Sequence, residues 1–165
     1  MSQITEKKLS AQLANDLKES SDLALVVSSH LHVEYWVDRL IAFHFPNRNK
    51  LKKLRLNYSR KIQLLAALGV KEEELKPLRY LGQLRNRFAH DIGYILEESK
   101  VSEFYEEFSA QNRDQLLVST QYLFPEISIP TFEDLGHKDK YRIMLASLCT
   151  AIRLAVTRLE NEKNA

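Results

Sequence analysis

The chain of 165 residues has little of what stabilises small secreted or β-rich folds. It contains a single cysteine, Cys149, so no disulfide can form within it. Only four glycines and four prolines are present, which argues against a turn-rich β fold. No apolar run approaches the roughly 18 residues of a membrane span, and the N-terminus lacks the apolar core of a signal peptide. We therefore expect a cytoplasmic protein, with Cys149 buried among its apolar neighbours.

Acidic residues are missing from one stretch of the chain. None occurs between Asp38 and Glu72, where nine basic residues lie, although the net charge of the whole chain is only +2. Such a basic strip, with Tyr58 among its cations, can bind a nucleic-acid backbone by releasing counterions. Alternatively, it solvates its own helix or faces the later glutamates at 97, 98, 103, 106 and 107. The candidate nucleic-acid-binding residues are Lys50, Lys52, Lys53, Arg55, Arg60 and Lys61.

What the chain does have is helical periodicity along most of its length. Apolar residues recur at helical spacing between capping and breaking residues. The predicted helices are Thr5 to Glu19, Asp22 to Phe45, Lys50 to Leu68 with Gly69 as its C-cap, Glu72 to Asp91, Val101 to Tyr122, and Lys138 to Glu160. The stretch from Phe124 to Gly136 predicts an extended loop. The sum is a single all-α domain over residues 1–165, a bundle of five to six helices.

The segment Leu84-Arg85-Asn86-Arg87-Phe88-Ala89-His90-Asp91 contains a misfit. At about 100° per residue, an apolar stripe occupies half of the helix circumference, and Arg85 projects from the middle of it. The stripe consists of Leu75, Leu78, Leu81, Leu84, Phe88 and Ile92. An unpaired buried charge is costly, so Arg85 must meet a carboxylate, line a wet cleft or face a second copy of the protein.

His90 lies near the predicted end of the same helix, roughly 140° around the axis from Arg85. Asn86, one turn earlier, can hydrogen-bond one imidazole nitrogen and leave the other for proton transfer. A plainer interpretation is also open. In it, Arg87 pairs with Asp91 at i, i+4, His90 caps the helix end and Arg85 is a structural ion.

The predicted helix from Asp22 to Phe45 carries misfits of its own. His30 and Glu34 fall on its apolar face, which also contains Leu23. An ion pair between Arg85 and Glu34 would give the misfit charge on each helix a buried partner. Groups with perturbed pKa values of this kind cluster at functional sites. His30 and Glu34 could begin a metal site, but no third ligand is evident. We expect neither a metal nor a cofactor.

The spacing Arg85-Asn86-x-x-x-His90 resembles the R-N-x-x-x-H signature of HEPN domains, helical modules found in toxins, phage-defence proteins and RNA-processing enzymes. Within that superfamily, the order of three segments resembles the mannitol-repressor-like branch. These segments are His32-Val33-Glu34, then Tyr58 to Gly69 ending in Leu-Gly, then Leu81 to Asp91. The resemblance covers about residues 20–95.

The resemblance implies a metal-independent endoribonuclease that acts on RNA as a homodimer, its two motif helices facing one cleft. Catalytic roles would go to Arg85, Asn86 and His90, and supporting roles to Glu34, Arg87 and Asp91. It also implies an antitoxin or regulatory protein partner, but Ile92 replaces the tyrosine that some such toxins carry for antitoxin modification. The same branch includes transcriptional regulators without known nuclease activity. A non-catalytic regulator is therefore the alternative, and a small-ligand binder a third.

Overall fold

The computed structural model describes residues 3–18, 21–123 and 132–164, and within them every regular element is an α-helix. This confirms the predicted all-α class. The helices are α1 (Gln3–Asp16), α2 (Asp22–His44), α3 (Arg48–Lys53), α4 (Tyr58–Ala67), α5 (Glu72–His90), α6 (Glu98–Glu106), α7 (Ala110–Leu123) and α8 (His137–Asn164).

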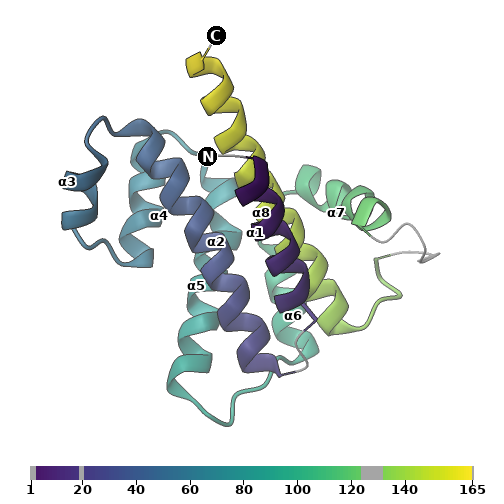
Figure 1. The fold of residues 1–165 in the computed structure, drawn as a ribbon. Helices are drawn as coiled ribbons and strands as arrows, with labels where there is room; N and C mark the ends of the chain where they lie inside the picture. Colours follow the sequence, from purple (N-terminus) through teal and green to yellow (C-terminus); the bar gives the residue numbers. More distant parts are fainter. Residues whose placement is uncertain (1–2, 19–20, 124–131, 165) are drawn as a thin grey trace.

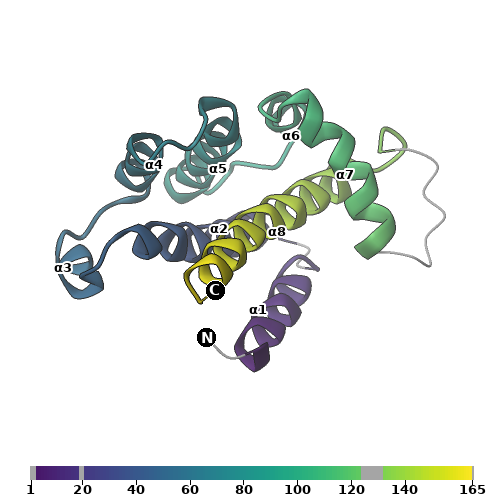
Figure 2. The same ribbon diagram turned by 90° about the horizontal axis from the view of Figure 1, so that it is seen from above.

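Helix α2 is the centre of the bundle. It packs along α8 and also contacts α1, α4 and α5, whereas α8 carries α6 and α7 further along its length (Figure 1). Seen from above, α4 and α5 lie on one side of α2 and α8, and α1 lies on the other (Figure 2). The three helices α2, α4 and α5 are therefore neighbours, and they carry Glu34, Arg85, Asn86 and His90 of the motif.

Local capping chemistry explains where several helices begin and end. The Ser21 side chain accepts a hydrogen bond from the Ala24 amide, as a Ser N-cap does at the start of a helix. Helix α4 ends in the expected manner at Gly69, whose φ is +92°. Its amide donates to Ala66 O and that of Val70 donates to Leu65 O, the two bonds of a Schellman motif.

Two of the predicted helices are each broken in two. The prediction of one helix from Lys50 to Leu68 is wrong, because Asn57 accepts a hydrogen bond from the Arg60 amide and starts α4 afresh. Arg55, in the break, has a φ of 46° and so leaves the right-handed helical region. The predicted helix from Val101 to Tyr122 is likewise interrupted, and Ser109 Oγ accepts from the Asn112 amide at the start of α7. Both caps are short polar residues that compete locally with helix continuation.

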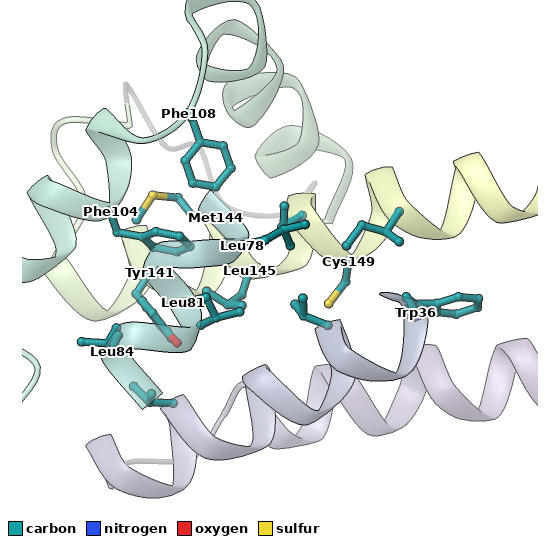
Figure 3. Packing of buried hydrophobic residues seen from close by; sticks show 14 of the residues in the cluster. Trp36, Leu78, Leu81, Leu84, Phe104, Phe108, Tyr141, Met144, Leu145 and Cys149 are labelled. Atoms are coloured by element: carbon teal, nitrogen blue, oxygen red, sulfur yellow. The ribbon is translucent and has the colours of Figure 1, made fainter. Parts of the chain in front are cut away.

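The core is one apolar cluster drawn from α2, α4, α5, α6, α7 and α8. Leu81, Leu84 and Tyr141 are among its fully buried members (Figure 3). Cys149 is buried as predicted, and burial raises the pKa of its thiol to about 12, so it is protonated at neutral pH. Some expected core residues are instead exposed, among them Leu23, Ile92 and Ala155 of α8. Leu23 lies in the first turn of α2, and Ile92 lies beyond the end of α5, where no helix covers it.

The predicted loop from Phe124 to Gly136 lies mostly outside the described residues. Its described end, residues 132–136, forms turns in which Phe132 is buried. Among the helices in the described ranges, none combines the length and the apolar character needed to cross a bilayer.

Candidate functional site

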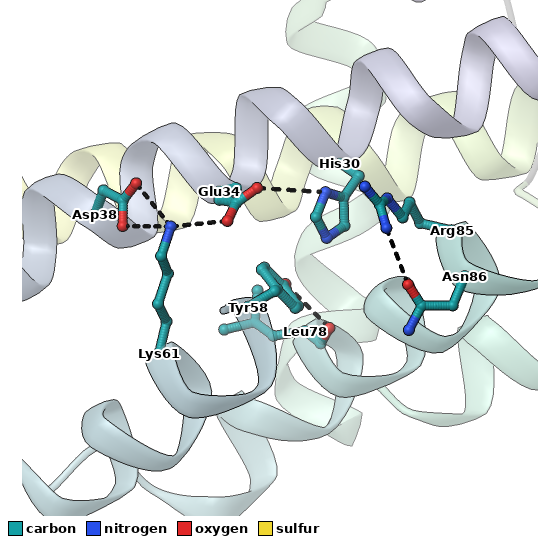
Figure 4. Close-up of polar contacts among 8 residues, drawn as sticks. All are labelled: His30, Glu34, Asp38, Tyr58, Lys61, Leu78, Arg85 and Asn86. Carbon is teal, nitrogen blue, oxygen red and sulfur yellow. Dashed lines mark hydrogen bonds and ion pairs between the residues drawn. The ribbon is translucent and has the colours of Figure 1, made fainter. Parts of the chain in front are cut away.

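A cleft of about 720 Å³ opens between α2, α4 and α5. Its walls carry cations, a carboxylate, amides and aromatic rings (Figure 4). The lining residues are His30 and Glu34 from α2, Asn57, Tyr58, Ser59, Ile62 and Gln63 from α4 and its cap, and Arg79, Gly82, Gln83, Arg85 and Asn86 from α5. Three predicted site residues, Glu34, Arg85 and Asn86, thus share one cavity.

Tyr58 joins the three helices at the base of this cleft. Its hydroxyl donates to Leu78 O at 3.0 Å, and its ring centroid lies 4.3 Å from that of His30. A Cβ placed on Gly82 would lie only 2.8 Å from two ring carbons of Tyr58. The absence of a side chain at Gly82 therefore lets the ring pack directly against α5. Tyr58 is not the exposed stacking residue that its place in the basic strip indicated.

Replacing Gly82 with valine is expected to destabilise the fold by about 1–3 kcal/mol, because the added carbons must displace the Tyr58 ring. Urea unfolding measures this loss. The matched control is Gly136→Val, since a Cβ at Gly136 meets no atom within 4 Å. Equal effects of the two substitutions would contradict the close packing of Tyr58 on α5.

His30 is buried at the cleft wall and is held neutral there. It is 4 % exposed, and its Nδ1 lies 3.8 Å from Glu34 Oε2. Burial lowers the pKa of His30 from its ordinary 6.5 to about 4, since the attraction of Glu34 is opposed by Arg85 and Lys61. At neutral pH the imidazole therefore offers one N–H donor and one acceptor to whatever enters the cleft.

This low pKa makes the fold sensitive to acid. Between pH 6.5 and about 4, the unfolded chain binds a proton at this position and the folded chain does not, so the free energy of unfolding falls as the pH falls. From pH 7 to pH 5, the wild type is expected to lose about 2 kcal/mol more than His30→Gln, at roughly 1.4 kcal/mol per pKa unit. Urea unfolding of both proteins at the two pH values measures this difference. Identical losses would show that His30 is not held neutral.

Glu34 is paired with a different cation from the one expected. Lys61 Nζ donates to Glu34 Oε1 at 2.7 Å and to Asp38 Oδ2 at 2.9 Å. The burial of the Lys61 ammonium opposes its charge, but these hydrogen bonds outweigh that effect and raise its pKa. The predicted ion pair between Arg85 and Glu34 is therefore wrong, because α4 brings a nearer ammonium to the carboxylate. Lys61 is also engaged inside the bundle rather than available to a phosphate backbone.

Arg85 is exposed at the cleft and makes no ion pair with any carboxylate in the described part of the chain. Its guanidinium Nη1 donates to Asn86 Oδ1 at 3.1 Å (Figure 4). Of the three environments that its helical position allowed, the wet cleft is the one observed. Asn86 therefore orients Arg85, and the expected hydrogen bond from Asn86 to His90 is not formed.

His90, in the last turn of α5, is exposed but does not line the cleft. Within one chain, the motif arginine and histidine therefore do not meet. Arg87 Nη1 donates to Tyr94 Oη at 3.2 Å, which raises the pKa of Arg87. Asp91 follows the helix and accepts from the Gly93 amide at 2.9 Å, so the alternative pair between Arg87 and Asp91 is also not formed.

Apart from Lys61, the candidate nucleic-acid-binding residues form an exposed surface at one end of α4. Lys50, Lys52, Lys53, Arg55 and Arg60 are exposed, and none makes an ion pair with a described carboxylate. The alternative in which they face the later glutamates is not observed for Glu103 and Glu106. Glu103 pairs with Lys100 and Glu106 pairs with Arg113, both near α6. We call these five cations the basic surface.

Sequence reasoning missed several lining residues, among them Asn57, Gln63 and Gln83. A signal existed only for Asn57, whose N-capping preference marks the end of α4 that faces the cleft. No group of three or more His, Cys, Asp or Glu side chains in the described ranges is arranged to hold a metal ion. His30 and Glu34 thus have no third ligand among those residues.

Comparisons with known proteins identify no relative. No protein-family model matches the chain, and neither a curated protein nor a solved structure is significantly similar to it.

Proposed function

We propose that this protein is a metal-independent endoribonuclease that binds the RNA backbone through Arg85 and the basic surface and uses His90 for proton transfer. The observation that carries the proposal is the state of Arg85. Its guanidinium is exposed in a cleft, oriented by Asn86 and unneutralised by any described carboxylate. An oriented, unpaired guanidinium is suited to bidentate contact with a phosphate.

The number of cations on the basic surface favours a polyanion such as RNA over a single small anion as the ligand. Five further exposed cations lie on α3, in the segment that follows it and at the start of α4, the helix that forms one wall of the cleft. Each phosphate that such residues neutralise releases counterions, which gives RNA binding a steep dependence on salt.

A homodimer would complete the site. Arg85 lines the cleft and His90 does not, so within one chain the motif arginine and the motif histidine lie apart. A two-fold axis beside α5 would bring His90 of one copy toward Arg85 of the other. An antitoxin or other regulatory partner that covers this region would silence the activity.

The chemistry needs no metal. The 2′-oxygen of the RNA attacks the adjacent phosphorus, the bond from phosphorus to the 5′-oxygen breaks, and a 2′,3′-cyclic phosphate and a 5′-hydroxyl result. His90 would take the 2′-hydroxyl proton or give a proton to the leaving oxygen. Arg85 would stabilise the charge that develops on the phosphoryl oxygens.

One observation favours the alternative of a non-catalytic regulator that binds nucleic acid. His90 has no hydrogen-bond or ion-pair partner among the described residues, so none of these residues orients its imidazole. In that case, the same cleft and basic surface would bind without cutting.

The test is incubation of RNA with the purified wild type in EDTA, followed by analysis of the product ends. Cleavage with cyclic phosphate ends supports the ribonuclease. Salt-dependent RNA binding by an intact protein that cuts neither total RNA nor tRNA would reject cleavage and leave the regulator. Light scattering in the same buffer measures the dimer, and a strict monomer that still cuts RNA would contradict the composite site.

A further inference from the structure

We propose that the cleft holds a guanine nucleotide of the RNA, with the base on Glu34 and the phosphate on Arg85. The inference rests on the proposed function, because it names the base that the RNA presents beside the bound phosphate. It assigns to Glu34 a role in specificity rather than the supporting role toward Arg85 that the sequence indicated.

The size and lining of the cleft suit a nucleotide. Its volume of about 720 Å³ is within the usual range for small-molecule sites. Aromatic and apolar groups from Tyr58, His30 and Ile62 lie beside amide side chains from Asn57 and Gln83. Flat apolar surface with a few directional polar groups is what a nucleobase requires.

Glu34 has an oxygen available to a ligand. Its Oε1 accepts from Lys61, whereas Oε2 lies 3.8 Å from His30 Nδ1, too far for a hydrogen bond. The side chain is 26 % exposed, so a ligand in the cleft can reach it. Guanine alone among the four RNA bases presents two adjacent N–H donors, N1–H and the 2-amino group, on one edge. A carboxylate is acceptor-only and can receive both.

Glu34 and Arg85 lie on either side of one residue of the cleft wall. His30 lies between Glu34 and Arg85 in the close-up, with Tyr58 beneath (Figure 4). Because His30 is neutral at pH 7, it does not compete as a cation for the carboxylate or repel the donor edge of a base. A base held by Glu34 on one side of His30 can therefore direct its phosphate toward the guanidinium of Arg85 on the other side (Figure 4).

The test is calorimetric titration of the full chain with the 3′- and 5′-monophosphates of guanosine, adenosine, cytidine and uridine. Guanosine monophosphate is expected to bind about tenfold to hundredfold more tightly than the others, the discrimination usual for a bidentate pair. Equal affinity for all four, or no binding, overturns the inference. This comparison uses the wild type, so it does not depend on the folding of a variant.

Two variants locate the contacts. Glu34→Gln replaces one acceptor with a donor and is expected to remove the guanine preference, while Lys61 keeps its contact with Asp38. Arg85→Ala is expected to weaken all four nucleotides equally, since it removes a phosphate contact. The matched control is Glu73→Gln, an exposed carboxylate on α5 outside the cleft, which is expected to change nothing. Retained guanine preference in Glu34→Gln would overturn the assignment.

Mononucleotide binding separates this inference from the proposed function, because it requires neither cleavage nor His90. If the wild type cuts RNA but shows no base preference in titration, the base assignment fails and the ribonuclease stands. If guanosine monophosphate binds selectively but RNA is not cut, cleavage fails and the base assignment stands.

Discussion

Replacing His90 with alanine is expected to reduce RNA cleavage by at least about 100-fold, the usual loss when a general acid or base is removed. RNA affinity is expected to stay near that of the wild type, because His90 does not line the cleft and the cations of the basic surface are intact. Single-turnover cleavage in EDTA measures the first quantity, and a filter-binding titration measures the second.

The chain contains a suitable control for this variant. His44 lies in the last turn of α2 as His90 lies in the last turn of α5, and both are exposed. His44→Ala is expected to cut RNA at the wild-type rate. If His90→Ala and His44→Ala are equally active, His90 has no part in the chemistry, and any cleavage must be assigned to other residues.

The largest loss of stability is expected from Phe104→Ala. Phe104 is fully buried in α6, between Phe108 and Tyr141 in the core (Figure 3). Its ring contacts those of Tyr80, Phe108 and Tyr141 at centroid distances of 5.5, 5.2 and 5.8 Å. Removing it loses both the transfer of the ring from water and the packing around it, because this aromatic cluster between α5, α6 and α8 cannot easily close. The free energy of unfolding should fall by about 3–5 kcal/mol.

Urea unfolding monitored by circular dichroism measures that change. Ile92→Ala is the control, since Ile92 is a large apolar side chain that is fully exposed, and its removal should alter stability by less than about 0.5 kcal/mol. A loss below 1 kcal/mol for Phe104→Ala would contradict the packing of α6 against α5 and α8.

The sequence predicted the motif helix well because the evidence was local. Leu81, Leu84 and Phe88 recur at helical spacing, and all are buried in α5 as expected. The break at Asn57 was missed because the leucines before and after it continue the same helical spacing. The spacing of apolar residues carries no information about a capping side chain. The break became evident only from the hydrogen bond that the Asn57 side chain accepts from the Arg60 amide.

The sequence predicted three members of the candidate site but not their contacts. Glu34, Arg85 and Asn86 were singled out as polar residues near apolar stripes, and all three line the cleft. Their partners could not be read from spacing. Lys61, which pairs with Glu34, lies 27 residues further along the chain. This ion pair depends on how closely α4 lies beside α2.

By itself, the sequence determined the helical class, most helix ends, the basic stretch and the choice of Arg85 as a misfit. Each of these follows from interactions within a few residues, such as side-chain spacing, capping and local charge. Only the tertiary structure decided that His30 is buried and neutral, that Tyr58 packs on Gly82 and that Glu34 pairs with Lys61 instead of Arg85. Those outcomes depend on distances between helices, where a shift of a few ångströms changes which cation reaches a carboxylate first.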